Sequence, residues 1–179
     1  KQNQQVIWDG LADGLFTVFS SDHAPFCFDG TEGKKPGGQE VAFQHIPNGL
    51  AGIETRMPLL YSEGVLGGRI TLQRFVELTA TNPAKAYGLH PRKGTIAIGS
   101  DADLVIWDEG ERTVRNTDLH HAVDHTPYEG MVLRAWPGTT LAGGEVVWHG
   151  GVFHPRRGQG RYLRRGRPSL LPRLEPRGG

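Results

Sequence analysis

Apolar residues along the chain follow helix-like and strand-like patterns in turn. Residues 15–19 form a short apolar run bounded by turn formers, which is typical of a strand buried on both faces of a parallel sheet. Residues 53–63 and 71–87 carry apolar residues at helical spacing, and Thr71 is a plausible N-cap for the second region. The Thr-Asn-Pro step at 81–83 predicts a break that divides this region into two helices.

After Gly88, which is expected to end the last helix, the pattern changes to short strands separated by glycine turns. Strands are predicted at 102–108, 113–115, 131–136 and 145–149. Several short strands with glycine turns favour a small β-sandwich or barrel. The chain is therefore predicted to be α/β and to comprise residues 1–90, a β-domain at 91–155, and an Arg- and Pro-rich arm at 156–179.

A glycine-rich, charged segment at 27–44 follows the first predicted strand and reads as a long loop. Loops of this length in compact domains tend to be functional, and its part from 29 to 40 is expected to border a substrate entrance. The chain begins without an initiator Met, a signal-peptide pattern or a helix cap. We therefore expect it to have been cut from a longer protein.

The composition limits the possible functions. Hydrophobic residues make up 37% and charged residues 22% of the chain, and the net charge is +1. These values describe a folded globular protein, and they give no reason to expect binding to nucleic acid or a membrane. The 26 glycines and 12 prolines argue against a helical bundle. The single cysteine, Cys27, suits the reducing cytoplasm.

One basic stretch leaves a second interpretation open. Six arginines surround Tyr162: Arg156, Arg157, Arg161, Arg164, Arg165 and Arg167. Such a stretch can contact phosphate backbones. Because the rest of the chain is not basic and offers no stacking platform, a solvated arm that contacts other subunits is favoured over a nucleic-acid site.

Asp22 and His23 are the strongest chemical feature, since they stand directly after a predicted buried strand. The carboxyl end of a strand is where α/β enzymes place their chemistry, and a carboxylate there can bind a divalent metal and accept a proton. A turn-capping aspartate with a neighbouring histidine fits the spacing equally well. His120, His121 and His125 lie between predicted strands and are interpreted as surface or packing residues.

The segment Ser-Asp-His-Ala-Pro-Phe at 21–26 resembles the last metal-ligand motif of cyclic amidohydrolases. Further segments resemble the dihydropyrimidinases and hydantoinases of that group, at 46–50, 52–56, 79–85, 88–89, 91–96, 99–108 and 128–131. The last of the motifs in the predicted β-domain would be weak alone, because many amidohydrolases share it, but the ordered set is specific. The resemblance covers roughly residues 6–165.

This resemblance implies a hydrolase that opens the cyclic amide of dihydropyrimidines or 5-substituted hydantoins with a metal-bound hydroxide. It implies the C-terminal part of a (β/α)8 TIM-like barrel with a small β-sandwich, a homotetramer, and two zinc ions bridged by a carboxylated lysine. Asp22 would be a metal ligand and the catalytic proton carrier. Asn48 would bind the cyclic ureide substrate, chiefly through its backbone carbonyl, and His23 would support the site without binding metal.

The family's other metal ligands would all lie upstream of this chain. Lys34 and Lys35 stand in a loop and are not assigned as the bridging lysine. We therefore expect the 179-residue chain to be inactive alone and poorly folded in its first half. Two alternatives remain within the resemblance: an allantoinase or dihydroorotase, which carry a similar Asp-His-Ala-Pro motif, and a non-catalytic scaffold relative.

Overall fold

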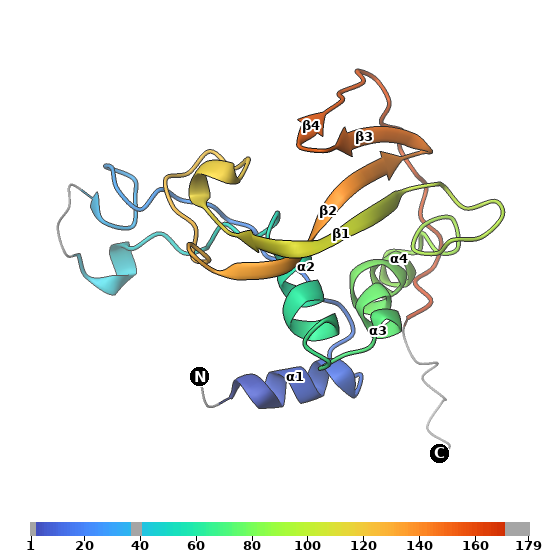
Figure 1. Ribbon diagram of the computed structural model, residues 1–179, viewed down its shortest axis with the longest axis horizontal. Coiled ribbons are helices and arrows are strands. Elements are labelled where there is room, and N and C mark those ends of the chain that lie inside the picture. The colour runs from blue at the N-terminus through green and yellow to red at the C-terminus, as the bar shows by residue number, and fades with distance from the viewer. Residues whose placement is uncertain (1–2, 37–40, 171–179) are drawn as a thin grey trace, which may run out of the picture.

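The computed structural model describes residues 3–36 and 41–170. These residues form a group of helices and one β-sheet (Figure 1). The helical elements are α1 (Gln4–Ala12), α2 (Arg56–Leu59), the π-helical turn η3 (Leu60–Val65), α3 (Leu72–Val76), the π-helical turn η4 (Glu77–Thr81) and α4 (Asn82–Ala86). Two 3₁₀ turns are η2 (Phe43–His45) and η5 (Asn116–Asp118). The strands are β1 (Leu104–Thr113), β2 (Val132–Ala142), β3 (Glu145–His149) and β4 (Val152–Phe153).

Helix α1 is absent from the sequence-based prediction, which found no helix cap at the start of the chain. The cap is indeed weak, because the Asn3 side chain makes no hydrogen bond to the first turn. The helix instead buries Leu11 and packs Trp8 against the main apolar cluster. Packing of one apolar face therefore stabilises this helix in place of a capping signal.

The predicted strand at 15–19 is wrong. This segment is extended but forms no ladder with any other part of the described chain, and the Leu15 side chain is 76% exposed. Its backbone contacts the helices instead, since the Phe19 N–H donates to the Leu78 carbonyl at 3.0 Å. A strand needs a neighbouring strand to pair with its backbone, and the described residues place none beside this segment.

The two predicted helical regions are confirmed, but the predicted break at 81–83 is wrong. Thr81 and Asn82 both keep helical dihedral angles, so α3, η4 and α4 form one continuous helical run. The wide π turn before Pro83 makes room for a ring that would collide with the carbonyl four residues earlier in a regular α-helix.

Both ends of this helical run were predicted correctly. The Thr71 hydroxyl accepts a hydrogen bond from the Arg74 N–H at 3.1 Å, as an N-cap does. At the other end Gly88 has φ +67°, and the Leu89 N–H donates to the Ala84 carbonyl at 2.8 Å. This is the Schellman arrangement, which requires the left-handed conformation that glycine adopts freely.

The four strands form one antiparallel sheet in the order β1-β2-β3-β4. The predicted strand at 145–149 is confirmed as β3. The strands predicted at 102–108 and 113–115 are largely one strand, β1, and β4 was not predicted. The sequence places the end of β2 before Pro137, but the strand continues to Ala142. A register shift between Ile106 and Trp107 lies opposite Pro137, so the missing N–H falls where the ladder is already irregular.

The helices and the sheet share one apolar core. Leu60, Phe75 and Leu78 are almost fully buried together with Ala135 of β2. The Trp107 ring of β1 stacks on Tyr61, with 4.7 Å between the ring centroids. The buried Ser62 hydroxyl accepts hydrogen bonds from the backbone of residues 134 and 135. The sheet is therefore fixed directly to the helices that support the candidate site.

The arm runs back along the helices over its described part. The Gly166 N–H donates to the Gly88 carbonyl at 2.7 Å, and the Ser169 N–H donates to the Lys85 carbonyl at 3.0 Å. These bonds attach the arm to the C-terminal end of α4 and to the glycine that caps it. Residues 171–179 of the predicted arm lie outside the described residues. Within residues 3–36 and 41–170, no helix has the length and apolarity needed to cross a lipid bilayer.

Candidate active site

Asp22 stands at the end of the extended segment that leaves α1. It is exposed, and its φ of 46° makes it the one non-glycine residue with a positive φ in the described part of the chain. Aspartate is one of the few residues that adopt this left-handed conformation without a large penalty. Unusual backbone conformations cluster at functional sites, so the geometry marks Asp22 as a position to consider in the candidate site.

The His23 imidazole holds the turn that leads into α2. Its Nδ1 accepts hydrogen bonds from the N–H groups of Gly52 at 3.0 Å and Ile53 at 3.2 Å. A ring nitrogen that accepts carries no proton, so a neutral His23 has its hydrogen on Nε2. The backbone reinforces this contact, because the Ala24 N–H donates to the Leu50 carbonyl at 3.2 Å. His23 thus joins the Asp22 segment to the chain that follows the loop.

The turn that carries Asn48 packs against the same segment. The Lys34 ammonium donates to the Pro47 carbonyl at 2.8 Å, on one side of exposed Asn48. On the other side Gly49 lies against Ala24, so closely that a Cβ on Gly49 would come within 2.5 Å of the Ala24 Cβ and carbonyl oxygen. The structure therefore brings the segment of Asp22 and His23 next to the turn that carries Asn48.

This close approach makes Gly49 a sensitive position. We expect Gly49→Ala to destabilise the protein by about 2–5 kcal/mol, because it adds an overpacked contact of about 1–3 kcal/mol to a left-handed strain of about 1–2 kcal/mol. Gly99 is the matched control, since it has φ +90° but its Cβ would meet nothing within 4 Å. Denaturant unfolding of both variants measures the difference, and equal losses would contradict the packing argument.

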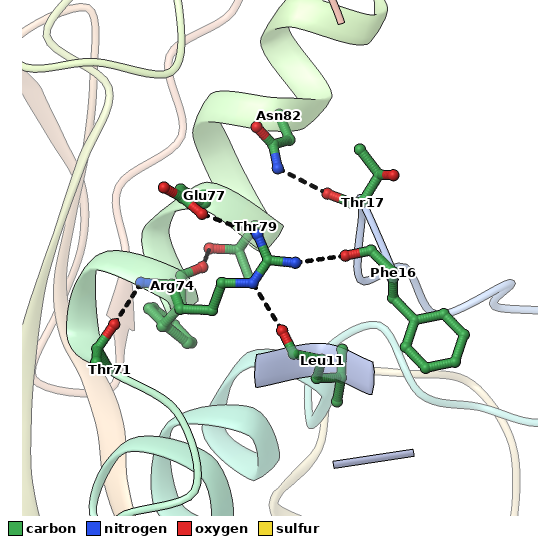
Figure 2. Close-up of polar contacts among 9 residues, drawn as sticks. Leu11, Phe16, Thr17, Thr71, Arg74, Glu77, Thr79 and Asn82 are labelled. Carbon is green, nitrogen blue, oxygen red and sulfur yellow. Dashed lines mark hydrogen bonds and ion pairs between the residues drawn. The ribbon is translucent and has the colours of Figure 1, made fainter. Parts of the chain in front are cut away.

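Side chains of the helices hold the end of α1 and the extended segment that follows it, and Figure 2 shows those of Arg74 and Asn82. Arg74 donates from Nε to the Leu11 carbonyl at 2.7 Å and from Nη2 to the Phe16 carbonyl at 2.6 Å. Asn82 donates from its amide to the Thr17 carbonyl at 2.9 Å. A guanidinium nitrogen of Arg56 donates to the Phe19 carbonyl. These bonds satisfy backbone groups that a neighbouring strand would otherwise pair.

The connection between β1 and β2 also reaches the site. The Asp124 carboxylate accepts hydrogen bonds from the N–H groups of Phe28 at 2.6 Å and Asp29 at 3.0 Å. The His120 Nδ1 lies 2.9 Å from a Glu54 carboxylate oxygen, just before α2. The sheet thus fixes two segments that follow the Asp-His motif in the chain.

The two backbone donors hold the pKa of Asp124 at about 2, below its ordinary value. Because the folded pKa is lowered, this contact stabilises the fold above the ordinary carboxyl pKa of about 3.9 and is lost as the pH falls through about 2. We expect the amide resonances of Phe28 and Asp29 to titrate with an apparent pKa of about 2. Asp124→Asn should remove that titration, and a midpoint near 3.9 would contradict the assignment.

A hollow of about 190 Å³ lies beside these contacts. Four of its lining residues carry titratable side chains: His23, Glu54, His120 and His121. Nevertheless, the described residues contain no group of three His, Cys, Asp or Glu side chains placed to hold a metal ion. His121 instead contacts the Asn116 amide oxygen from Nε2 at 2.8 Å, and His125 contacts Asp124.

Comparison with known proteins identifies the family. Residues 1–147 match the amidohydrolase family. The chain belongs to the amidohydrolase family. It is 43% identical to the D-hydantoinase of Ralstonia pickettii over 92% of this chain and 35% of that protein. It is 40% identical to the D-phenylhydantoinase of Escherichia coli O1:K1 over 97% of this chain and 37% of that protein.

A solved structure gives the same result. The D-hydantoinase (dihydropyrimidinase) from Thermus sp. superimposes with a TM-score of 0.85 and 42% identity, over 96% of this chain and 36% of that one. This amidohydrolase chain therefore has the α/β fold of the family over the part it covers, and it spans about a third of the length of these relatives.

Amidohydrolase membership implies dependence on a divalent metal. An exposed carboxylate such as Asp22 is a ligand type that these ions accept. Because the described residues offer no cluster of three ligands, this part of the amidohydrolase fits one ligand position and not a whole metal centre.

Sequence reasoning missed several residues that shape the site. Arg74, Arg56 and Asp124 act on backbone groups that are distant in the chain, and nothing in their local patterns indicates this. Arg74 gives one weak signal, because it is charged and lies within the apolar stripe of the predicted helix. Asn82 was noticed only as part of a predicted helix break.

Proposed function

We propose that this chain is the C-terminal third of a metal-dependent hydrolase that opens the cyclic amide of hydantoins or dihydropyrimidines. The similarity to D-hydantoinases over more than nine-tenths of the chain is the observation that carries the proposal. The left-handed Asp22 beside the Asn48 turn supports it, since a ligand and a substrate contact belong at one place.

We assign three roles to residues of this chain. The Asp22 carboxylate binds metal, takes a proton from the attacking water, and returns it to the ring nitrogen as the C–N bond breaks. The Asn48 backbone carbonyl accepts a hydrogen bond from a ring N–H. His23 positions Asp22 by holding residues 52 and 53. A divalent metal, when bound, supplies Lewis-acid polarisation of the ring carbonyl.

The finer composition of the complete enzyme belongs to the same proposal. Two zinc ions and a carboxylated lysine are proposed, with the remaining ligands on other segments. Lys34 is not that lysine, because its ammonium binds the Pro47 carbonyl. Residues 1–90 are proposed to complete a (β/α)8 barrel, and residues 91–155 to form half of a β-sandwich. One antiparallel sheet with a groove of about 980 Å³ over its strands supports the second assignment. The complete enzyme is proposed to be a homotetramer.

The decisive experiment compares the complete protein with the 179-residue chain. Both are supplied with Zn²⁺ and with hydantoin or dihydrouracil, and formation of the N-carbamoyl product is measured. We expect turnover by the complete protein and none by the chain, because one carboxylate cannot form the whole metal site. Turnover of allantoin or dihydroorotate alone would replace the substrate assignment. A complete protein that turns over none of these compounds would overturn the proposal and favour a scaffold protein.

A further inference from the structure

A single guanidinium fixes both ends of the turn that leads to Asp22. The Leu11 carbonyl belongs to the last turn of α1, and the Phe16 carbonyl begins the extended segment. Between them, the Phe16 N–H donates back to the Gly10 carbonyl at 3.2 Å. Figure 2 shows Arg74 between the two carbonyls, with its remaining arm directed to Glu77.

The Arg74 side chain is well placed to act as a rigid spacer. It is only 13% exposed, and three of its nitrogens bind three different acceptors, including a Glu77 oxygen at 2.8 Å. Hydrogen bonds from a charged donor are about twice as strong as neutral ones, and the planar guanidinium keeps them in fixed directions. Arg74 therefore fixes the distance between the end of α1 and the start of the extended segment together with the Phe16–Gly10 backbone hydrogen bond.

The position of Asp22 depends on this spacing. Between Phe16 and Asp22 the chain is extended, and two further side-chain contacts hold it at Thr17 and Phe19. The Phe19 N–H also donates to the Leu78 carbonyl, and beyond Asp22 the Ala24 N–H donates to the Leu50 carbonyl. Asp22 therefore lies between contacts to the helices on its upstream side and contacts to the Asn48 turn on its downstream side, and Arg74 contributes to the upstream set. Loss of the Arg74 contact at Phe16 would loosen the upstream end of this segment, whose last residue is Asp22.

We infer that Arg74 is a positioning residue for the Asp22 carboxylate, and that it acts through the backbone without touching metal or substrate. The inference rests on the proposed function, because it assumes that Asp22 is a metal ligand. It assigns the Arg74–Glu77 ion pair a lesser role: Glu77 is half-exposed and steadies the guanidinium, whereas the two carbonyl contacts set the geometry.

The test uses the complete protein and three variants, Arg74→Gln, Arg74→Lys and Glu77→Gln. Zn²⁺ affinity is measured by chelator competition, and hydrogen exchange is followed at residues 11–19. We expect Arg74→Gln to lower Zn²⁺ affinity by about 10- to 100-fold, as loss of a group that orients a ligand does. The rate of amide hydrogen exchange at residues 11–19 should also increase in this variant. Arg74→Lys should recover part of the affinity, because one ammonium can reach one carbonyl, and Glu77→Gln should change it less than threefold.

Combination with Asp22→Asn separates positioning from general loss of structure. If Arg74 acts through Asp22, Arg74→Gln should lower Zn²⁺ affinity no further in a protein that already carries Asp22→Asn. Equal losses in both backgrounds, or unchanged affinity with Arg74→Gln alone, would overturn the inference. If Asp22→Asn itself leaves Zn²⁺ affinity unchanged, the proposed function fails instead, so the two failures are distinguishable.

Discussion

On the proposed function, replacement of Asp22 by asparagine is expected to lower the kcat/KM of the complete protein for hydantoin by about 10²- to 10⁴-fold or more, without loss of the fold. Removal of a general acid–base group alone has an effect of this size, and loss of a metal ligand adds to it. The fold should tolerate the change because Asp22 is exposed and asparagine also adopts its left-handed backbone conformation.

The matched control for this substitution is Asp13→Asn. Asp13 is an exposed aspartate at the end of α1, just before the extended segment, and it has no proposed role in the reaction. Initial rates, bound Zn²⁺ and thermal unfolding should be measured for both variants. Equal activity of Asp22→Asn and the unmodified protein would remove Asp22 from the site, whereas a lowered melting temperature would indicate a structural role.

Truncation of Leu78 will produce a large loss of local stability. This side chain is fully buried in the core shared by helices and sheet, and its backbone carbonyl accepts the hydrogen bond from Phe19. We expect Leu78→Ala to cost about 2–5 kcal/mol, a large part of the roughly 5–15 kcal/mol that stabilises a typical domain. The segment before Asp22 should loosen together with the helix.

Native-state hydrogen exchange measures this effect without assuming two-state unfolding of a large protein. Amides of α3, η4 and α4 should lose protection by the corresponding free energy. Val76 provides the control on the same helical run, since it is 42% exposed and its truncation should cost far less. Similar losses for Leu78→Ala and Val76→Ala would show that burial in this core does not control the stability of the run.

Local signals in the sequence predicted where the helical run begins and ends better than they predicted which segments pack against each other. Thr71 and Gly88 act within one turn of their own positions, so their roles follow from residue type. The segment at 15–19 has the composition of a buried strand, yet strand formation depends on neighbours that local composition does not contain. The helix α1 is the opposite case, because a core contact at Leu11 stabilises a segment without a capping signal.

In the candidate site too, local sequence reveals some residues and not the contacts between distant ones. Asp22 and His23 are contiguous in the chain, so their motif can be recognised from the order of residues alone. The contacts that orient them join Arg74 to Leu11 and Asp124 to Phe28, across separations that no local pattern encodes. Residue type alone did not distinguish these charged side chains from ordinary surface charges.

The π turn η4 has a consequence for the alignment of side chains on the helical run. Eight residues separate Arg74 from Asn82, and in a regular α-helix of 3.6 residues per turn they would point about 80° apart. A π turn advances by fewer degrees per residue, so the five residues of η4 remove much of that difference. Both side chains thereby face neighbouring carbonyls of one segment (Figure 2). The π turn η4 thus brings the two side chains onto the same side of the helical run. A one-residue deletion within η4 would rotate Asn82 away from the segment it binds.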